Sequence, residues 1–408
     1  MAKHDAFFDV NKKSAAILKH AILRKYLAVF AARLGSTLVG HRVGFVDGYA
    51  GPGNYVNIRT GTVSEGSPQI ALKIATGLLA TGRKLDCVFV EKDPAIFSRL
   101  NALVSTAHTP AVAWKGDIAH HLQQAMARLD GVPTLVFLDP FGATVDVDMT
   151  INTILKRPGM VTTELLLNFS LDALRRIGGR LFEDDAAPGR TKALERADGW
   201  LGGPWWRQHF FDAASTEDND FIDNAATAVA REYNKRIQRA TGCSTFSVPI
   251  RRRAHHKPIF FLTLFFPRNL AGYAYNEAVS LALQEWRKIM GELDVDDAAR
   301  RQEKEGFVLG EPSPEELTQI LQAAAVQFDA DVIADIKENL RQQFVEHASL
   351  SVESQVKLVL GRSLGAGREK HLRAAWNQLY AEGVTAGKAP SGKLDRVIIQ
   401  RRTAPVFR

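Results

Sequence analysis

The chain has 408 residues, of which 46% are hydrophobic and 24% charged, so it is long enough for two or three compact domains with sizeable cores. No stretch reaches the roughly 18 to 20 uninterrupted apolar residues of a membrane span, and the start of the chain lacks the apolar segment of a signal peptide. We therefore expect a cytoplasmic protein with no membrane partner, and the two distant cysteines, Cys87 and Cys243, exclude a Zn or Fe–S centre built from thiols.

The net charge of +7 is concentrated at the C-terminal end of the chain. From residue 361 onward there are ten basic and three acidic side chains, so this segment alone accounts for +7 and the rest of the chain is neutral. A concentrated basic segment is typical of proteins that bind the phosphate backbone of nucleic acids. A tail that only improves solubility is the alternative.

Strands and helices are predicted to alternate through the first part of the chain. Apolar residues at helical spacing predict a helix over residues 14–34, ended by Gly35. Apolar runs then predict strands over residues 42–46, 85–90, 111–114, 134–138 and 163–169. Helices lie between them, with Ser67, Asp93 and Asp117 as the expected N-caps. This pattern predicts the α/β class, with a Rossmann-like parallel sheet covered by helices on both faces.

The remainder of the chain departs from this alternation. Residues 171–240 predict a helical insertion rich in tryptophan, and residues 245–250 and 259–266 predict an antiparallel pair of strands, followed by a helix to about residue 290. We therefore expect a first domain over residues 1–290. Residues 291–312 are so highly charged that we expect a linker or a solvated helix. Residues 313–408 then show helices followed by a basic hairpin containing Gly and Pro, an order typical of a winged helix but shared by other small helical domains.

The segment after the first predicted strand carries the strongest sign of a ligand site. It consists of Asp47, Gly48, Tyr49, Ala50, Gly51, Pro52 and Gly53. Glycines let the backbone turn tightly and approach a ligand closely, and a carboxylate at a strand end accepts hydrogen bonds from a cationic or amino group. A purely structural turn is the alternative.

Acidic residues also follow the next two predicted strands. Glu91 ends the second strand, where a carboxylate can bind the two vicinal hydroxyls of a ribose. Asp117 follows the third strand, where it can accept a hydrogen bond from an adenine amino group while Ile118 packs on the ring. Helix capping is the alternative explanation for Asp117. Because the carboxyl ends of parallel strands meet at one edge of a sheet, the acids together predict a nucleoside-binding pocket.

The fourth predicted strand ends in Asp139-Pro140-Phe141-Gly142, which resembles the catalytic turn of amino-group methyltransferases. By that resemblance Asp139 accepts hydrogen bonds from a target amino group, and Phe141 stacks on a base that is unpaired or flipped out. The motif departs from the better-known one, because it lacks a second proline and places the aromatic residue one position earlier. A tight turn with Phe141 in the core is the alternative.

Taken in order, these segments resemble the three-Cys-motif partner proteins, TcmP, over roughly residues 14–290. The matching pieces are Lys19 to Leu27 in the first helix, Asp47 to Gly53, Gly66 to Pro68, Val90 to Asp93, Phe137 to Gly142, and Leu165 to Phe169. The resemblance implies a class I methyltransferase-like core that binds S-adenosylmethionine through Asp47, Gly51, Gly53, Glu91, Asp117 and Asp139. It also implies a partner protein that bears the three cysteines, and a bacterial origin associated with phage or mobile elements.

The sequence therefore predicts an S-adenosylmethionine-dependent methyltransferase that modifies nucleic acid, at an amino group of a base. We expect basic side chains in two places to bind phosphates: Arg251, Arg252, Arg253, Lys257, Lys388 and Lys393. Two alternatives stay open. The protein binds the cofactor without catalysis and serves its partner protein, or it methylates a protein or a small molecule.

Overall fold

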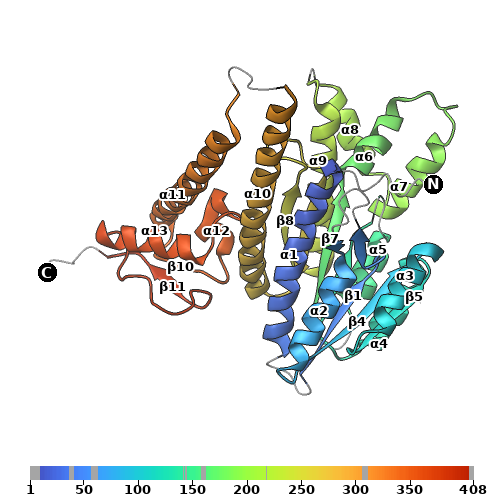
Figure 1. Cartoon of the computed structure of the whole chain (residues 1–408), viewed down its shortest axis with the longest axis horizontal. Helices are drawn as coiled ribbons and strands as arrows, with labels where there is room; N and C mark the ends of the chain where they lie inside the picture. Colours follow the sequence, from blue (N-terminus) through green and yellow to red (C-terminus); the bar gives the residue numbers. More distant parts are fainter. Residues whose placement is uncertain are drawn as a thin grey trace. The chain divides into compact units, whose positions relative to one another are not determined.

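The computed structural model describes residues 10–35, 41–56, 63–140, 142, 145–157, 162–216, 218–305 and 311–403. It is of the α/β class and divides into two compact units, Met1–Arg268 and Asn269–Arg408 (Figure 1). The division falls earlier than the boundary expected after residue 290, because one continuous helix runs from Asn269 to Glu305. None of the described helices is both long and apolar enough to span a membrane.

The described part of the first unit is organised around a seven-stranded sheet in the order β5-β4-β1-β6-β7-β9-β8. Its strands are β1 (Arg42–Asp47), β4 (Lys84–Glu91), β5 (Ala111–Lys115), β6 (Thr134–Leu138), β7 (Thr163–Ser170), β8 (Ser244–Ile250) and β9 (Phe260–Phe266). The first five of these are parallel to one another, and β9 pairs antiparallel with both β7 and β8. The predicted strands and the predicted antiparallel pair are therefore confirmed.

The strands are mostly apolar because helices cover both faces of the sheet. All eight residues of β7 and all five of β6 are buried. Helices α1 (Val10–Gly35) and α2 (Ser67–Leu79) pack together and contact β1, while α3 (Pro94–Ser105) contacts β4 and β5. The connection through α4 (Ile118–Arg128) runs back across the sheet, so a right-handed crossover places α4 on the opposite face.

The predicted helical insertion extends the core on the α4 face. It contains α6 (Leu171–Gly179), η3 (Arg180–Phe182), α7 (Arg190–Leu201), α8 (Trp206–Ala214) and α9 (Phe221–Thr241), preceded by α5 (Val147–Met149) and the π-helical turn η2 (Thr150–Leu155). Trp200 and Trp206 are buried in one hydrophobic cluster with residues of α4 and the sheet, so these tryptophans serve packing.

Two local predictions differ from the structure. Asp93 and Asp117 cap α3 and α4 as expected, but Ser67 is wrong as an N-cap, because Gly66 precedes α2 and Ser67 is its first helical residue. A short hairpin of β2 (Asn54–Val56) and β3 (Val63–Glu65) was not predicted, since each strand is only three residues long.

The second unit has its own hydrophobic core. Its elements are α10 (Asn269–Glu305), α11 (Pro314–Glu346), β10 (Ser349–Ser351), α12 (Val356–Leu360), η4 (Gly361–Ser363), α13 (Glu369–Ala381) and β11 (Ile398–Gln400). Strands β10 and β11 pair antiparallel, and a bridge between Thr385 and Arg401 closes a hairpin. The charged segment expected as a linker or solvated helix is helical up to Glu305. Assignment of this unit as a winged helix stays a prediction.

Candidate cofactor and catalytic site

The strand order of the sheet reverses between β1 and β6. From β1 the chain moves outward to β4 and β5, and it then returns to β6 and β7 on the other side. In open α/β sheets, ligands bind outside the carboxyl ends of the strands at such a reversal. Asp47 ends β1, and Asp139 directly follows β6, so both predicted site residues lie at this point.

Asp47 is fully buried at the end of β1. Its Oδ1 accepts a hydrogen bond of 3.2 Å from the backbone N–H of Tyr49, whereas its Oδ2 has no hydrogen-bond partner among the described residues. Burial raises the pKa of this carboxyl to about 7, with the Ser67 hydroxyl and the Tyr49 amide acting in the opposite direction. A buried carboxylate with an unpartnered oxygen costs free energy unless a donor or cation is supplied from outside.

The glycines of the loop after β1 have separate roles. Gly51 and Gly53 adopt φ angles of +68° and +84°, which favour glycine, so they make the turn. A Cβ on Gly48 would lie 2.6 Å from Cδ2 of Leu138 and 2.9 Å from Cγ1 of Ile118, so this glycine permits close packing. Between Gly48 and Gly51, Ala50 is buried, whereas Tyr49 is half-buried against the core.

Glu91 connects this loop to the end of β4. Its Oε2 accepts a hydrogen bond of 2.9 Å from the N–H of Gly51, and its Oε1 accepts one of 2.8 Å from the N–H of Asp93. A carboxylate has about four acceptor positions, so Glu91 keeps positions for further donors such as two hydroxyls. The structure thus places Asp47, Glu91 and the glycine loop together, as the sequence predicts.

Asp117 and Ile118 lie at the same edge, after β5, but the structure gives them other contacts. Asp117 accepts a hydrogen bond of 3.1 Å from the N–H of Ala119 and so caps α4. Ile118 is only 1% exposed and packs in the hydrophobic core. Capping and core packing account for both residues, and their contact with an adenine ring stays a prediction.

Asp139 is held by two side chains from distant parts of the chain. Nζ of Lys19, on α1, lies 2.7 Å from both Oδ1 and Oδ2 of Asp139, and Nδ2 of Asn168, on β7, donates to Oδ1 at 2.7 Å. Oδ1 of Asn168 is buried and has no partner within the described ranges. Pro140 is buried, and Phe141 lies outside the described residues, so its expected stacking role is not tested.

The sequence motifs predict no role for Lys19, although its position among core residues of the helix is a signal. Lys19 is a charged residue that is only 8% exposed on a helix whose neighbouring positions, Leu18 and Ile22, are core residues. A buried lysine requires a partner, and Asp139 supplies it. Nζ of Lys19 also lies 4.9 Å from the centre of the Phe260 ring, which favours the cation further.

His20 and Tyr55 form a second pair of residues near Asp139 that the sequence did not single out. Their rings stack with centroids 6.3 Å apart and an interplanar angle of 13°. Burial and, to a smaller extent, the charge of the adjacent Lys19 lower the pKa of His20 to about 4, against the opposing effect of Asp139, so this imidazole is neutral at neutral pH. It can therefore act as a hydrogen-bond donor or acceptor in the site without adding charge.

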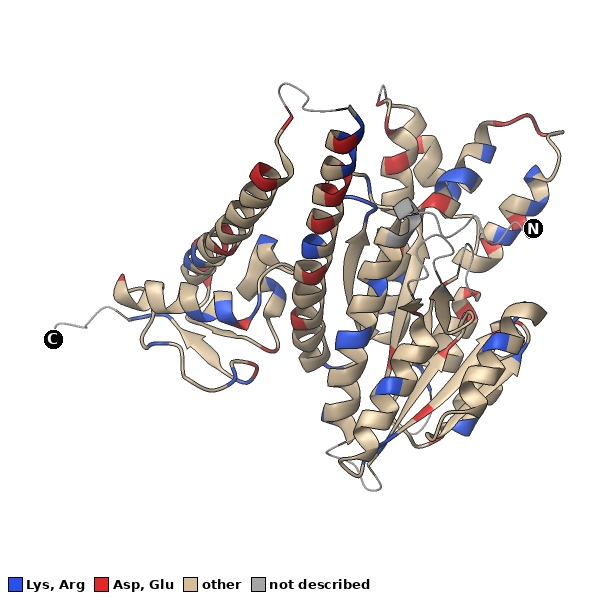
Figure 2. Cartoon of the chain, viewed as in Figure 1, with Lys and Arg blue, Asp and Glu red and all other residues tan. Residues whose placement is uncertain are grey.

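The basic residues expected to bind phosphates are only partly available for that role. Lys257 pairs with Asp223 and with Asp220, whose Oδ1 lies 2.6 Å from its Nζ, and Arg252 lies 3.7 Å from Asp172. Arg251 and Arg253 share the connection between β8 and β9 with them. Basic and acidic residues are interspersed on the helices of both units (Figure 2). The β8–β9 connection is therefore less strongly basic than its sequence suggests.

Lys388 and Lys393 belong to the second unit. Both side chains are exposed, and neither has an ion-pair partner in the part of the chain that the structure describes. Lys388 lies over the Tyr380 ring, 5.7 Å from its centre. These two lysines therefore remain available for an anionic ligand.

No protein-family model matches the chain, and a comparison with curated proteins gives no significant match. Functional assignment therefore depends on the geometry described above. The similarity to TcmP proteins stays a prediction based on the ordered motifs.

Proposed function

We propose that this protein is an S-adenosylmethionine-dependent methyltransferase that acts on an amino group of a nucleic acid base. The observation that carries the cofactor assignment is the unpartnered, buried Oδ2 of Asp47 at the reversal of strand order. S-adenosylmethionine carries an ammonium, a sulfonium and a ribose, so it offers an ammonium donor to Asp47 and hydroxyl donors to Glu91. The residues present therefore fit this cofactor.

The sheet topology supports the same proposal. Its parallel strands follow the general dinucleotide-binding plan, but the antiparallel strand β9 is inserted between β7 and β8. An antiparallel strand at this position is characteristic of class I methyltransferase sheets. Because one fold serves many functions, the strand order supports the cofactor class only, and the site residues must indicate the substrate.

Asp139 and Asn168 are suited to hold a target amine. Three hydrogen bonds from Lys19 and Asn168 occupy three of about four acceptor positions on Asp139, which leaves one position open. Oδ1 of Asn168 is a second open acceptor beside it. Two acceptors match the two N–H groups of an amine.

The residues of the site then have defined roles in the transfer. When bound, S-adenosylmethionine would supply the electrophilic methyl group and take up the displaced electron pair on its sulfur. Asp139 and Asn168 would orient the nitrogen lone pair toward that carbon and stabilise the positive charge that develops on nitrogen. One proton leaves the methylated nitrogen, so the products are the N-methylated base, the thioether form of the cofactor and a proton.

We also propose that the second unit is a winged-helix-like module that binds the phosphate backbone. Its support is the basic composition of the chain from residue 361 and the exposure of Lys388 and Lys393. A partner protein bearing the three cysteines remains part of the proposal through the TcmP resemblance alone.

The test is transfer of a tritiated methyl group from S-adenosylmethionine to single-stranded and duplex DNA and RNA. Asp139→Asn is expected to lower transfer by about 100-fold while cofactor binding persists, because it weakens the acceptor for the developing charge. Asp148→Asn, which removes an exposed carboxylate of α5, serves as the matched control and should leave transfer unchanged.

Three results would contradict parts of the proposal. Transfer that does not depend on Asp139 would remove this residue from catalysis. Cofactor binding without transfer to any nucleic acid would favour a cofactor-binding partner protein, or a methyltransferase of another substrate class. Failure to bind S-adenosylmethionine in calorimetry would reject the cofactor assignment itself.

A further inference from the structure

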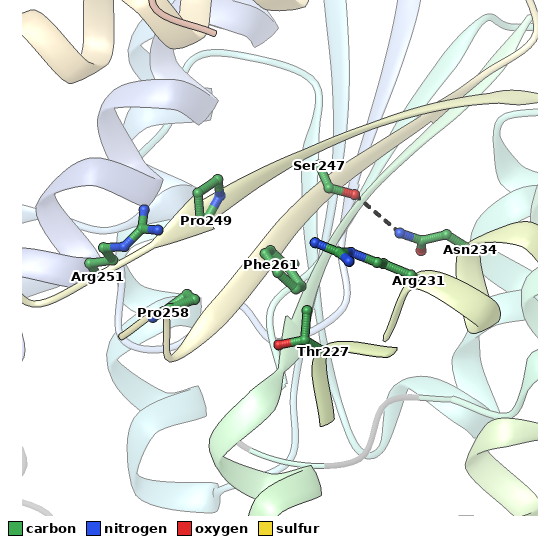
Figure 3. Close-up of a pocket in the computed structure, with 8 residues that line it drawn as sticks. All are labelled: Thr227, Arg231, Asn234, Ser247, Pro249, Arg251, Pro258 and Phe261. Carbon is green, nitrogen blue, oxygen red and sulfur yellow. Dashed lines mark hydrogen bonds between the residues drawn. The ribbon is translucent and has the colours of Figure 1, made fainter. Parts of the chain in front are cut away.

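A recess lies on the face of the sheet that α9 covers, and it shares no residue with the Asp47 and Asp139 site. Its volume is about 400 Å³, and it is formed by α9, β8, β9 and the connection between the two strands (Figure 3). The residues that carry the argument are Arg231 and Asn234 from α9, Ser247 and Pro249 from β8, Arg251 after β8, and Phe261 from β9.

The local geometry explains why these side chains meet. Arg231 and Asn234 are three residues apart on a helix, so they lie on the same face of α9. Ser247, Pro249 and Arg251 alternate along an extended segment, so their side chains point to the same face of the sheet. Pro249 pairs directly with Phe261 in the register of β8 and β9.

Two arginines enter this recess without a counter-charge. Neither Arg231 nor Arg251 has a hydrogen-bond or ion-pair partner among the residues that the structure describes, whereas the neighbouring Arg252 and Lys257 both pair with aspartates. Figure 3 shows the two guanidinium groups on either side of Phe261. Guanidinium groups present forked donors that match phosphate oxygens, so the recess is suited to a phosphate.

The floor of the recess is apolar and aromatic. Phe261 is half-buried, with its inner side packed against the hydrophobic core of the first unit, and Pro249 lies beside it. At the rim, Nδ2 of Asn234 donates to Oγ of Ser247 at 3.1 Å. A partly exposed ring next to a phosphate site is the combination with which proteins bind an unpaired nucleotide, whose base stacks on the ring.

The recess and the proposed catalytic residues lie at the same edge of the sheet, on its two faces. Phe260 and Phe261 are consecutive residues of β9, so their side chains point to opposite faces. Phe260 contacts Lys19, which holds Asp139, while Phe261 lines the recess. A single strand of nucleic acid that crosses this edge can therefore contact both places.

We propose that this recess binds one unpaired nucleotide of a single-stranded nucleic acid, with its base on Phe261 and the phosphates on its two sides bound by Arg231 and Arg251. The inference rests on the proposed function for its choice of a nucleic acid ligand. The inference adds to the proposed function a binding site for the substrate strand, in which Arg231 and Phe261 are binding residues.

The test measures binding of a labelled single-stranded oligonucleotide to the full chain by fluorescence anisotropy at several salt concentrations. Arg231→Gln and Arg251→Gln are each expected to weaken binding and to reduce the slope of log K against log salt by about 0.7, the value for one lost phosphate contact on a single strand. Arg196→Gln is the matched control, because Arg196 is an exposed arginine of α7 with no partner within the described ranges. If Arg231→Gln and Arg251→Gln bind like Arg196→Gln, the proposal is overturned.

A second arm tests the base. Phe261→Leu keeps an apolar side chain against the core and is expected to weaken binding of the oligonucleotide about tenfold, while binding of an abasic strand of equal length is unchanged. If Phe261→Leu loses the same affinity for the intact and the abasic oligonucleotide, or loses none for either, base stacking on Phe261 is overturned. Circular dichroism of each variant separates these outcomes from a loss of folding.

These measurements use no methyl transfer, so they separate this inference from the proposed function. If oligonucleotide binding depends on Arg231 and Arg251 but the protein transfers no methyl group, the nucleotide site is supported and the methyltransferase activity is rejected. If the protein methylates nucleic acid but both arginine variants bind the oligonucleotide normally, the methyltransferase activity is supported and the nucleotide site is rejected.

Discussion

Nζ of Lys19 lies 2.7 Å from each carboxylate oxygen of Asp139, a residue 120 positions later in the chain. Helix α1 thus completes a site that is otherwise built at the ends of strands. Because both side chains are largely buried, with 11% and 18% of their surfaces exposed, neither charge is well solvated without the other.

This pairing predicts the effect of removing the lysine. Lys19→Met should lower the free energy of unfolding by about 2 kcal/mol, because it leaves the Asp139 carboxylate partly buried with only Asn168 as a donor. Lys192→Met removes an exposed lysine of α7 and should change stability by less than about 0.5 kcal/mol. Urea unfolding at neutral pH measures both. Equal midpoints for the two variants would show that the ion pair contributes nothing.

Cofactor affinity should depend on pH through Asp47. Burial raises the pKa of this carboxyl to about 7, so below that pH it is mostly protonated in the free protein, and a cationic ligand must displace the proton. The affinity for S-adenosylmethionine should therefore rise between pH 6 and pH 8, and Asp47→Asn should bind weakly at both values. Calorimetric titration measures the affinity at both pH values. If the affinity of the unchanged protein is the same at pH 6 and pH 8, the role of Asp47 is contradicted.

Glu164 predicts a pH-dependent change in stability. It is buried in β7, where its Oε2 accepts a hydrogen bond from the Tyr26 hydroxyl, and burial raises its pKa to about 7, against the opposing effect of that hydrogen bond. Since the folded-state pKa lies above the unfolded value, this carboxyl stabilises the fold only at low pH, and stability falls as pH rises through 7.

The variant Glu164→Gln lacks this titration. Relative to the unchanged protein, it should gain about 2 kcal/mol more stability at pH 8 than at pH 5, measured by chemical unfolding at both pH values. Glu195→Gln, at an exposed position of α7, provides the control and should show no such difference. A gain that is the same at pH 5 and pH 8 would argue against a raised pKa.

Two glycines should respond oppositely to substitution by alanine. Gly48→Ala should destabilise the protein by about 1 to 3 kcal/mol, because the new methyl group would overlap Leu138 and Ile118 behind the loop that follows β1. Gly77→Ala should stabilise it by about 0.5 to 1 kcal/mol, because Gly77 lies in α2 with nothing within 4 Å of the added carbon. Thermal unfolding compares the two, and a shift of the same sign in both would contradict the packing argument.

Local pattern in the sequence was sufficient for most of the sheet. The apolar runs that end at Asp47 and Glu91 are strands because both faces of the sheet are covered, so that side chains on both sides of each strand are mostly apolar. The cap at Asp93 is also a local feature, because its side-chain oxygen accepts hydrogen bonds from the first N–H groups of the helix that directly follows it. Ser67 shows the limit of such reasoning, because a cap and the first helical residue differ by one position.

The sequence by itself determined the α/β class, the antiparallel final strands and the acids at the strand ends, because each depends on a period or a residue type within a short segment. Only the tertiary structure decided which of those acids keeps a buried oxygen without a partner, that Lys19 and Asn168 hold Asp139, and that Arg231 and Arg251 line one recess. These contacts join residues far apart in the chain, so they depend on the order in which the strands assemble. Strand order is a property of the whole packed sheet, and no local pattern encodes it.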